Sequence, residues 1–522
     1  MLLLWAALCV FLGLRRAGDA PDDMFISFRY AWNLAHGEGF VFNPGERVFG
    51  LTNPGHALVL ALLHALTRVP VHVLAGIVYA AALWAVAALL WIELRRRGAA
   101  WEGALGGTLV LGASYLWSPV GSAAPAVLAL LAGAALLADR RPVASGLLAA
   151  LAVWYRPDAV LGVAALGVLS WLERRRLPWR FALAAGALIL VGLVAAWLWF
   201  GSFLPDTLEA KWVRADARDS AGIGPEGFWR RSAPLMSRHF GPAWMLLVAL
   251  GLVGQWPLFA RGGRSARTLV LYGAGVAVAY PLLRVPYFNW YTIPPVLALL
   301  YGAGAAAAGV GRALAGALAG RGDPEGPAPR PVRAVLPGAV GVLAAALVLA
   351  PVALSFAEAS LSRFRAYRGQ NRFATFRQAA LWIRDHSLPE ERIAYGEIGN
   401  LAYWSERPLD DLLGLVTPEA LPYVAANDPN GAFLRRPPDF YVDHPANPHP
   451  GIAKTAWFRA GYHSVAEFPG VHGTATVYRK YPDAELPPPR PPRERPPRRR
   501  GQDPASRGTA APAERGTGGG TR

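Results

Sequence analysis

Long stretches without a single Asp, Glu, Lys or Arg recur along most of this chain. They cover residues 73–92, 103–138, 142–155, 159–172, 181–205, 240–260, 268–283, 285–311 and 334–357. A helix needs roughly 20 mainly apolar residues to cross the hydrocarbon of a bilayer, and a helix satisfies its own backbone polar groups there. A soluble core does not need so many charge-free runs. The pattern therefore predicts a polytopic α-helical membrane protein.

Arginines gather between these runs. The chain holds 52 basic and 35 acidic residues, a balance that would suggest nucleic acid for a soluble protein. Here the arginines lie in the loops between apolar runs, as cytoplasmic loops do under the positive-inside rule. The clusters are Arg95-Arg96-Arg97, Arg140-Arg141, Arg174-Arg175-Arg176, Arg261/Arg264/Arg267 and Arg312/Arg321/Arg330/Arg333. We therefore expect membrane lipid as a partner and no nucleic acid.

Alternation of sides across these loops gives a topology of about 11 transmembrane helices. Residues 1–14 cross outward, and the long outer segments are 15–72, 200–241 and 357–522. The apolar stretch 55–68 is too short to cross and is expected to lie flat on the outer leaflet. Residues 1–14 have no basic residues before them, and Leu14-Arg15-Arg16 follows where a signal peptide would have small residues. A start codon placed too far downstream is the preferred explanation.

The C-terminal third has a different character. Residues 370–386 place Phe373, Phe376, Ala380 and Ile383 on one helical face, and short strand-like runs follow at 392–395, 440–443 and 474–478. We predict a transmembrane domain at 1–356 and a small extracytoplasmic α/β domain at 357–480. The Pro- and Arg-rich segment 481–522 cannot bury a core and is expected to be a disordered basic tail.

A carboxylate pair opens the first outer loop. Asp22 and Asp23 follow Pro21, and a helix beginning at Asp22 carries two distinct faces. One face holds Asp22, Ile26, Arg29 and Asn33, and the other, expected in the lipid headgroup layer, holds Phe25, Phe28 and Trp32. Such a carboxylate can take a proton from a sugar hydroxyl that attacks an anomeric carbon, while cations assist a departing phosphate. The alternative is that Pro-Asp-Asp is an ordinary helix N-terminus.

The first outer loop resembles that of the C-type (GT-C) membrane glycosyltransferases. The resemblance rests on the segment from Asp22 to Pro54, and is nearest to the branch that contains the mycobacterial terminal arabinofuranosyltransferases. Looser matches follow in the rest of the chain, to about residue 480. They are Arg156-Pro157-Asp158, the segment from Phe200 to Lys211, Glu397 to Tyr403, and Asp410 to Leu415.

The resemblance implies an inverting transferase that moves a sugar from a polyprenyl-phosphate donor to a glycan or glycolipid acceptor. It implies a bacterial cytoplasmic membrane with the active site on the outer side. Asp22 or Asp23 is the expected general base, and a divalent cation held by the two carboxylates stays an open alternative, with no cofactor certain. Arg29, Arg156 and Lys211 are the candidates for the donor phosphate, and each could instead be an ordinary interfacial cation. Asn33, Asp158 and Asp206 are candidate substrate-binding residues, while Asp410-Asp411 is expected to be structural.

Two departures from the family pattern matter. Relatives often carry a Gly-Leu-Glu-Thr-like turn where this chain reads Gly121-Ser122-Ala123-Ala124-Pro125, and Pro-Asn-Thr where it reads Pro205-Asp206-Thr207. The first departure removes a carboxylate from the expected site. The missing carboxylate keeps open a scaffold without transferase activity, and the other alternative is a membrane transporter or lipid-binding protein in which Asp22 and Asp23 bind a cation or a proton. No Gly-rich phosphate loop follows a strand, so a nucleotide-sugar donor is not expected.

Overall fold

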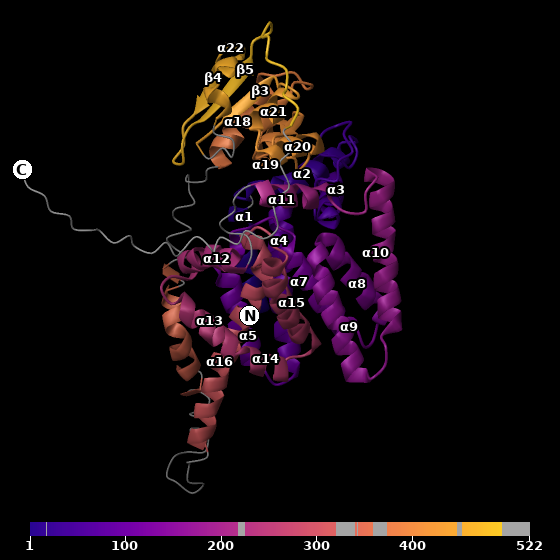
Figure 1. The fold of residues 1–522 in the computed structure, drawn as a ribbon. Helices are drawn as coiled ribbons and strands as arrows, with labels where there is room; N and C mark the ends of the chain where they lie inside the picture. Colours follow the sequence, from indigo (N-terminus) through magenta and orange to yellow (C-terminus); the bar gives the residue numbers. More distant parts are fainter. Residues whose placement is uncertain are drawn as a thin grey trace, which may run out of the picture.

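A computed structural model describes residues 1–16, 18–217, 225–319, 340–341, 343–355, 357–358, 373–445 and 451–492. A bundle of helices carries a smaller sheet-containing domain at one end (Figure 1). The predicted tail beyond residue 492 and the loop around residue 325 lie outside the described residues.

Apolar helices of very different lengths make up the bundle. They are α1 (Leu2–Arg16), α4 (Val71–Arg96), α5 (Ala100–Gly112), α6 (Ser114–Trp117), α7 (Ala124–Leu137), α8 (Pro142–Tyr155), α9 (Val160–Arg174), α10 (Trp179–Phe200), α13 (Trp244–Val253), α14 (Gln255–Arg261), α15 (Arg264–Leu282) and α16 (Ile293–Ala319). A further apolar helix covers Leu343–Ser355. The charge-free runs predicted these helices, with the run 103–138 divided among α5, α6 and α7.

Within the described residues, four helical segments are long and apolar enough to cross a bilayer. They are Val71–Arg96, Trp179–Phe200, Trp244–Arg261 and Ile293–Ala317. The helices Pro54–Thr67, Ala124–Leu137, Pro142–Tyr155 and Leu343–Ser355 are apolar but shorter. The fold class is therefore that of a helical membrane protein, while the count of about 11 crossings stays a prediction.

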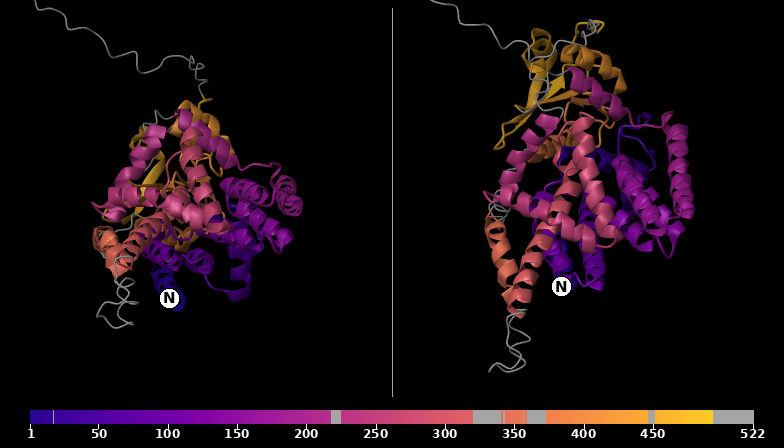
Figure 2. Two further views of the ribbon diagram at one scale, coloured as in Figure 1. Left: turned by 90° about the horizontal axis from the view of Figure 1, so that it is seen from below. Right: turned by 60° about the horizontal axis from the view of Figure 1, so that its bottom comes forward.

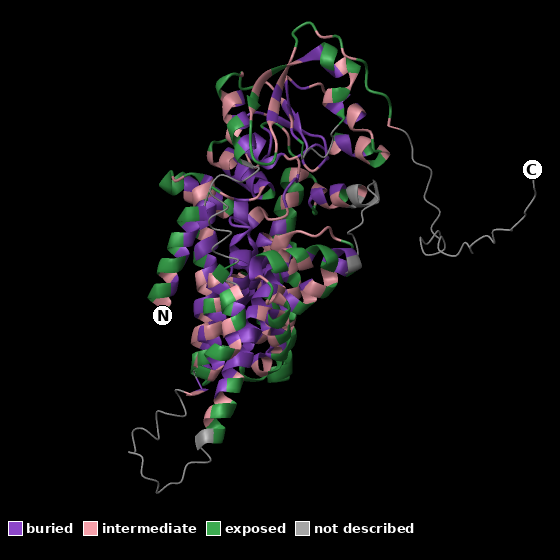
Figure 3. Cartoon of the chain, turned by 90° about the vertical axis from the view of Figure 1, so that its left-hand side faces the viewer, coloured by how far each residue is buried: buried purple, intermediate pink, exposed green. Residues whose placement is uncertain are grey.

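Buried residues concentrate along the centre of the bundle and in the sheet (Figure 3). Small residues allow the central helices to approach closely, as is usual where helices pack in lipid. A Cβ atom added at Gly254 would meet the backbone of Gly302, so α16 and the end of α13 pack backbone to backbone there. The helix α10 lies at the edge of the bundle (Figures 1 and 2) and leaves most of its apolar residues exposed. Its exposed face is the one expected to meet lipid tails.

A layer of shorter helices separates the bundle from the sheet. It contains α2 (Asp22–Ala35), α3 (Pro54–Thr67), α11 (Asp206–Ala217) and α12 (Pro225–Phe240). On α3, Leu58, Leu62 and Leu66 form an exposed apolar row at a spacing of four residues. That row suits the predicted position of residues 55–68 on a membrane surface.

The C-terminal domain is a five-stranded sheet with helices packed against it. Its strand order is β2-β1-β3-β5-β4, with β1 parallel to β2 and β3, and β5 antiparallel to β3 and β4. The strands are β1 (Ile393–Tyr395), β2 (Leu409–Asp411), β3 (Phe440–Asp443), β4 (Tyr462–Phe468) and β5 (Ala475–Lys480). The helices are α18 (Phe373–Asp385), α19 (Gly399–Ser405), α20 (Leu421–Ala426), α21 (Pro429–Leu434) and α22 (Ala456–Gly461), and the 3-10 turns of the chain are η1 (Pro157–Ala159), η2 (Asn289–Tyr291), η3 (Pro418–Ala420) and η4 (Ile452–Lys454).

The predicted elements of this domain are confirmed in β1, β3, β5 and α18. Phe376, Ala380 and Ile383 are buried on one face of α18, as the helical spacing predicted, while the side chain of Phe373 is outside the described part of the chain. The pair Asp410-Asp411 lies in β2, where the Asp411 carboxylate accepts hydrogen bonds from the backbone of Leu413 and Val416. Asp411 is therefore structural, as expected.

The aromatic face of α2 does not lie in the headgroup layer, which corrects the prediction. Phe25 and Phe28 are almost fully buried, and their rings lie 5.3 and 6.2 Å from the ring of Tyr403 in α19. An amphipathic pattern reports that a face needs apolar surroundings, but protein and lipid both supply them. Here the C-terminal domain covers the aromatic residues.

Candidate active site

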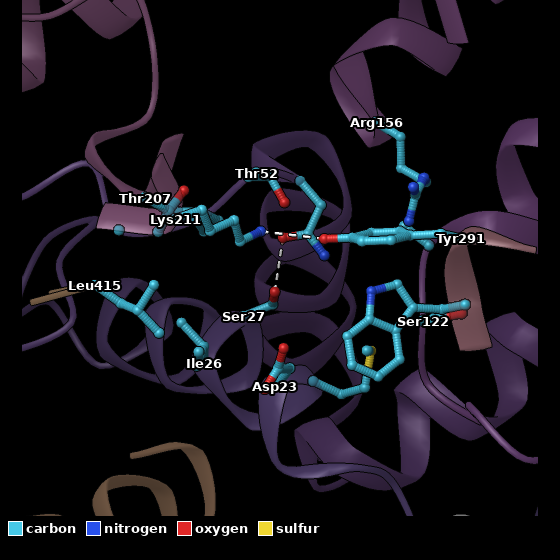
Figure 4. A pocket seen from close by; sticks show the side chains of 16 residues that line it. Asp23, Ile26, Ser27, Thr52, Ser122, Arg156, Thr207, Lys211, Tyr291 and Leu415 are labelled. Atoms are coloured by element: carbon cyan, nitrogen blue, oxygen red, sulfur yellow. Dashed lines mark hydrogen bonds between the residues drawn. The ribbon is translucent and has the colours of Figure 1, made fainter. Parts of the chain in front are cut away.

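An open cavity of about 620 Å³ lies where the bundle, the intermediate layer and the C-terminal domain meet. Seven segments of the chain form its wall, among them α2, α11, η2 and Arg156, the residue that follows α8 (Figure 4). The lining residues are Asp23, Met24, Ile26, Ser27, Gly50, Leu51, Thr52, Asn53, Ser122, Ala123, Arg156, Thr207, Lys211, Trp290, Tyr291 and Leu415. Asp23, Arg156 and Lys211, three of the residues that the sequence singled out, thus meet around one cavity.

The two carboxylates of the first loop have different surroundings. Asp23 is exposed and lines the cavity. Asp22 is 5% exposed, and its carboxylate accepts hydrogen bonds from the backbone N–H of Gly399 at 2.9 Å and of Asn400 at 2.7 Å, and from the Asn400 side chain at 3.0 Å. Asp22 therefore holds the first turn of α19 against α2, and Asp23 is the carboxylate of the pair that lines the cavity.

The alternative role of Asp22, as a cap of its own helix α2, is replaced by a contact with the N-terminus of α19. Pro21 occupies the N-cap position of α2, and no side-chain hydrogen bond caps that helix. The Asp22 carboxylate instead satisfies backbone donors at the start of α19, more than 370 residues later in the chain. The sequence around Asp22 gives no sign of this long-range partner.

Lys211 and Arg156 are organised by one aromatic ring. Lys211 Nζ donates a hydrogen bond to Tyr291 Oη at 3.1 Å and lies 5.9 Å from the centroid of that ring. The guanidinium carbon of Arg156 lies 5.3 Å from the same centroid. In Figure 4 Arg156 extends into the cavity from the upper right and Lys211 from the left, whereas Asp23 lies below both. The cavity therefore has a cationic side and an acidic side.

The position of Arg156 is fixed by neighbours behind the cavity. Its Nε and Nη2 atoms donate to the Asp158 carboxylate at 2.9 and 3.0 Å, and Nη2 also donates to Tyr280 Oη at 3.0 Å. Asp158 accepts a further hydrogen bond from Tyr272 Oη at 3.3 Å. Asp158 is thus the ion-pair partner of Arg156 and is not among the lining residues. Such buried partners restrict the rotamers of an arginine that contacts a ligand.

The other predicted residues do not line the cavity. Arg29 is 2% exposed and its Nε donates to the Phe42 carbonyl at 3.3 Å. Burial lowers the pKa of Arg29 to about 10, so it stays protonated at neutral pH. The Asn33 amide donates to the carbonyls of Val41 and Phe42, which orders the loop that follows α2.

Asp206 fastens the second outer loop to the first. Its carboxylate accepts from the backbone N–H of Phe49 at 2.9 Å, and its own N–H donates to the Phe49 carbonyl at 3.0 Å. The next residue, Thr207, reaches the cavity with a side-chain oxygen that is buried and has no hydrogen-bond partner among the described residues. Asp206 thereby positions Thr207 and, one helical turn later, Lys211.

Several lining residues were not expected from the sequence. Ser27 donates to the Asn53 side chain at 2.7 Å, and Trp290 and Tyr291 arrive from η2. Asn53 and Thr207 belong to segments that resemble the GT-C family, which was a usable signal. Tyr291 lies within a charge-free run, where the sequence gave no such signal.

The departure at Gly121–Pro125 falls inside the site. Ser122 and Ala123 line the cavity, and the carbonyl of Gly121 lies 3.0 Å from His56 Nε2, which anchors this turn. The only acidic residue among those that line the cavity in the described part is Asp23. No group of three or more His, Cys, Asp or Glu side chains that could hold a metal ion occurs among the described residues.

Comparison with solved structures identifies the fold. ArnT from Cupriavidus metallidurans bound to undecaprenyl phosphate superimposes with a TM-score of 0.57 at 14% identity, covering 93% of this chain and 99% of ArnT. The apo state of ArnT gives a TM-score of 0.55 at 16% identity, over 93% and 98% of the two chains. This chain shares their fold. The Archaeoglobus fulgidus oligosaccharyltransferase with a tethered acceptor peptide is more distant, with a TM-score of 0.51 at 12% identity over 93% of this chain and 74% of that one.

These neighbours have the GT-C membrane glycosyltransferase fold, so the coarse architecture expected from the first-loop resemblance is confirmed. Residues 363–483 match a family model described as a domain of unknown function, DUF8728. No curated protein matches the sequence. The arabinofuranosyltransferase branch is not confirmed by these comparisons.

Proposed function

We propose that this protein is an integral membrane glycosyltransferase that moves a sugar from a polyprenyl-phosphate donor to a cell-envelope glycan or glycolipid. One observation carries the proposal: an exposed carboxylate, Asp23, shares a cavity with the cations Arg156 and Lys211. The fold agrees with it, because the ArnT structure that superimposes on this chain holds undecaprenyl phosphate.

Asp23 acts as the general base. An acceptor hydroxyl hydrogen-bonded to the Asp23 carboxylate loses its proton to that carboxylate as its oxygen attacks the anomeric carbon of the donor sugar. The new bond forms as the bond between the anomeric carbon and the phosphate oxygen breaks. Attack from the side opposite the leaving phosphate inverts the anomeric configuration. The opposite placement of Asp23 and the cations in the cavity suits this geometry (Figure 4).

Lys211 and Arg156 bind the phosphate. A polyprenyl-phosphate sugar carries one negative charge on its phosphodiester, and the departing polyprenyl phosphate carries a second. Cations held in place beforehand stabilise this developing charge without reorganising during the reaction. Contacts with Tyr291, Asp158 and Tyr280 hold the two cations in this way. The charge of Arg156 is balanced by its ion pair with Asp158. Lys211 has no ion pair with a described carboxylate, so it supplies the net positive charge of the cationic side.

Leu415 of the sheet domain lines the cavity, so the domain and the cavity lie on the same side of the membrane. Because the positive-inside rule puts the arginine-rich loops in the cytoplasm, we propose that this side is the extracytoplasmic side of a bacterial cytoplasmic membrane. The donor is then a lipid-linked sugar, because polyprenyl carriers present sugars at the bilayer surface where nucleotide sugars are not supplied.

Asp23→Asn tests the base. The variant keeps the size of the side chain but cannot accept the proton, so transfer should fall by roughly 10² to 10⁴. Transfer is measured by thin-layer analysis of membranes supplied with radiolabelled polyprenyl-phosphate sugars. Asp385→Asn, at an exposed carboxylate in α18, is the matched control. Wild-type product levels from Asp23→Asn would remove Asp23 from the mechanism.

The donor class is tested with the purified wild-type protein. We expect transfer from polyprenyl-phosphate sugars and none from nucleotide sugars in the absence of polyprenyl phosphate. Robust transfer from a nucleotide sugar alone would contradict the proposed function. Binding of the lipid donor without transfer to any acceptor would favour the lipid-binding scaffold.

A further inference from the structure

A second group of cavities lies at the end of the bundle remote from the sheet. One cavity of about 920 Å³ lies between α14 and α16, and another of about 650 Å³ lies between α5, α16 and the helix Leu343–Ser355. Figure 1 shows α14 and the end of α16 at the opposite pole of the bundle from the strands. Arg312 lines both cavities, and Arg261 lines the larger one. Neither takes part in the proposed transfer.

Among the described residues, two arginines in this region share one carboxylate. The carboxylate of Glu102 is buried, with 3% of its side chain exposed, and it forms ion pairs with Arg312 and, at 3.7 Å, with Arg261. Two guanidiniums therefore share one carboxylate. Their side chains stay 38% and 54% exposed. Arg312 Nη2 has no hydrogen-bond partner among the described residues. The group has one positive charge and at least one N–H to offer to an anion.

The surroundings favour an amphiphile over a soluble anion. Apart from Arg312, the smaller cavity is lined by apolar residues and glycines: Trp101, Leu105, Ala308, Gly311, Ala315, Gly341, Ala345 and Ala346. Trp256, on the rim of the larger cavity, is 78% exposed, and Trp101 is 58% exposed. Tryptophans are enriched at the boundary between hydrocarbon and water, so both residues mark the depth of a lipid headgroup. A free phosphate would leave the apolar cavity empty.

We propose that this region binds an anionic phospholipid of the surrounding bilayer. The lipid phosphate contacts the guanidiniums of Arg261 and Arg312, and an acyl chain occupies the apolar cavity beside α5. Basic pockets between transmembrane helices are a recurring way to hold anionic headgroups. Glu102 competes with the lipid for the same guanidiniums, which sets the affinity. The site is separate from the catalytic cavity, so the proposal does not depend on the reaction.

Native mass spectrometry of the full chain tests the site, with phosphatidylglycerol and phosphatidylcholine of equal chain length as probes. The wild type should retain phosphatidylglycerol preferentially. The triple variant Glu102→Gln/Arg261→Gln/Arg312→Gln removes the cations without leaving a buried carboxylate unpaired. At about fivefold per charge, its preference should fall about fivefold below the wild type and about 25-fold below Glu102→Gln, because losing two positive charges is partly offset by losing one negative charge. Glu102→Gln alone frees both guanidiniums and should raise retention by about fivefold.

Arg140→Gln/Arg141→Gln is the matched control, because both residues are exposed in a loop that contributes nothing to either cavity. The control should keep the lipid preference of the wild type. An equal loss in the control would mean diffuse charge attraction and would overturn the site. The site would also be overturned if the folded triple variant bound phosphatidylglycerol at wild-type levels. A loss of retention in Glu102→Gln with an unchanged melting temperature would overturn it as well.

Discussion

Neighbouring residues Asp22 and Asp23 have different tasks because successive side chains on a helix point about 100° apart. One carboxylate is buried against α19, while the other faces the cavity. A sequence motif cannot separate two adjacent identical residues. Their partners separate them, and these partners come from the other end of the chain.

Asp22→Asn should destabilise the protein. The amide offers one acceptor oxygen in place of two, and its NH₂ group would face the backbone N–H of Gly399 or Asn400. Leaving a buried donor unsatisfied costs about 1–3 kcal/mol, so the melting temperature in detergent should fall and amide exchange in α19 should accelerate. Asp23→Asn, at an exposed position, should melt like the wild type. Equal melting temperatures for the two variants would show that Asp22 does not hold α19.

Tyr291→Phe should weaken the donor site. The ring remains, but the hydrogen bond from Lys211 Nζ to Tyr291 Oη is lost. Because hydrogen bonds to charged groups contribute about 1.5–3 kcal/mol, kcat/KM for the donor should fall about tenfold or more, with part of the loss in kcat because Lys211 also stabilises the departing phosphate. Initial rates over a donor series measure this. Tyr423→Phe, in α20, is the control, and an unchanged kcat/KM in Tyr291→Phe would contradict the positioning role.

At the scale of elements, the first outer loop is clamped to the C-terminal sheet. Asn43 exchanges two hydrogen bonds with the backbone of Leu409 in β2, at 3.0 and 2.9 Å. Glu46 forms ion pairs at 3.0 Å with Arg392 and with Arg436. The same loop continues to Gly50–Asn53 in the cavity wall. Docking of the C-terminal domain therefore shapes the site.

This clamp should loosen in acid. Burial opposes the ionisation of Glu46, but the hydrogen bond from Asn43 and the charges of Arg392 and Arg436 outweigh it and hold the pKa of Glu46 below its usual value. A depressed pKa gives stability that is complete above the unfolded value of about 4.3 and is lost as the pH falls through the folded value. Limited proteolysis between the bundle and the sheet should accelerate below about pH 4 in the wild type. Glu46→Gln should be cleaved faster at neutral pH and show less change in acid. An identical pH profile in the two proteins would exclude Glu46 as the cause.

At the scale of the whole molecule, the sheet and the candidate active site lie at one pole, and α14 and the end of α16 lie at the other (Figure 1). Reporter fusions at residues 40, 225 and 420 should therefore report the outer side, and fusions at 97, 175 and 264 the cytoplasm. A cytoplasmic signal at 420 would refute the odd number of crossings. Because Leu415 borders the cavity, it would also move the proposed active site to the cytoplasmic face.

The sequence alone determined the class of the protein and its local elements. Charge-free runs predicted the helices of the bundle, since an apolar segment in lipid has to satisfy its own backbone. Alternation and helical spacing predicted β1, β3, β5 and the buried face of α18. The strands β2 and β4 were not predicted, because two of the three residues of β2 are aspartates, which disfavour strands, and β4 mixes polar and apolar side chains on both faces. Arg156 and Lys211 were found by their residue types within resembling motifs.

Only the tertiary structure decided which of these residues work together. Arg29 and Arg156 were both candidates in the sequence, but the loop after α2 encloses Arg29 away from the cavity. Tyr291 carries no charge and was not a candidate, yet both Arg156 and Lys211 contact its ring or hydroxyl. The same holds for the aromatic face of α2, which protein covers in place of lipid. Hydrophobic periodicity indicates which side chains of a local segment are buried. What buries those side chains depends on contacts between segments hundreds of residues apart, and only folding brings those segments together.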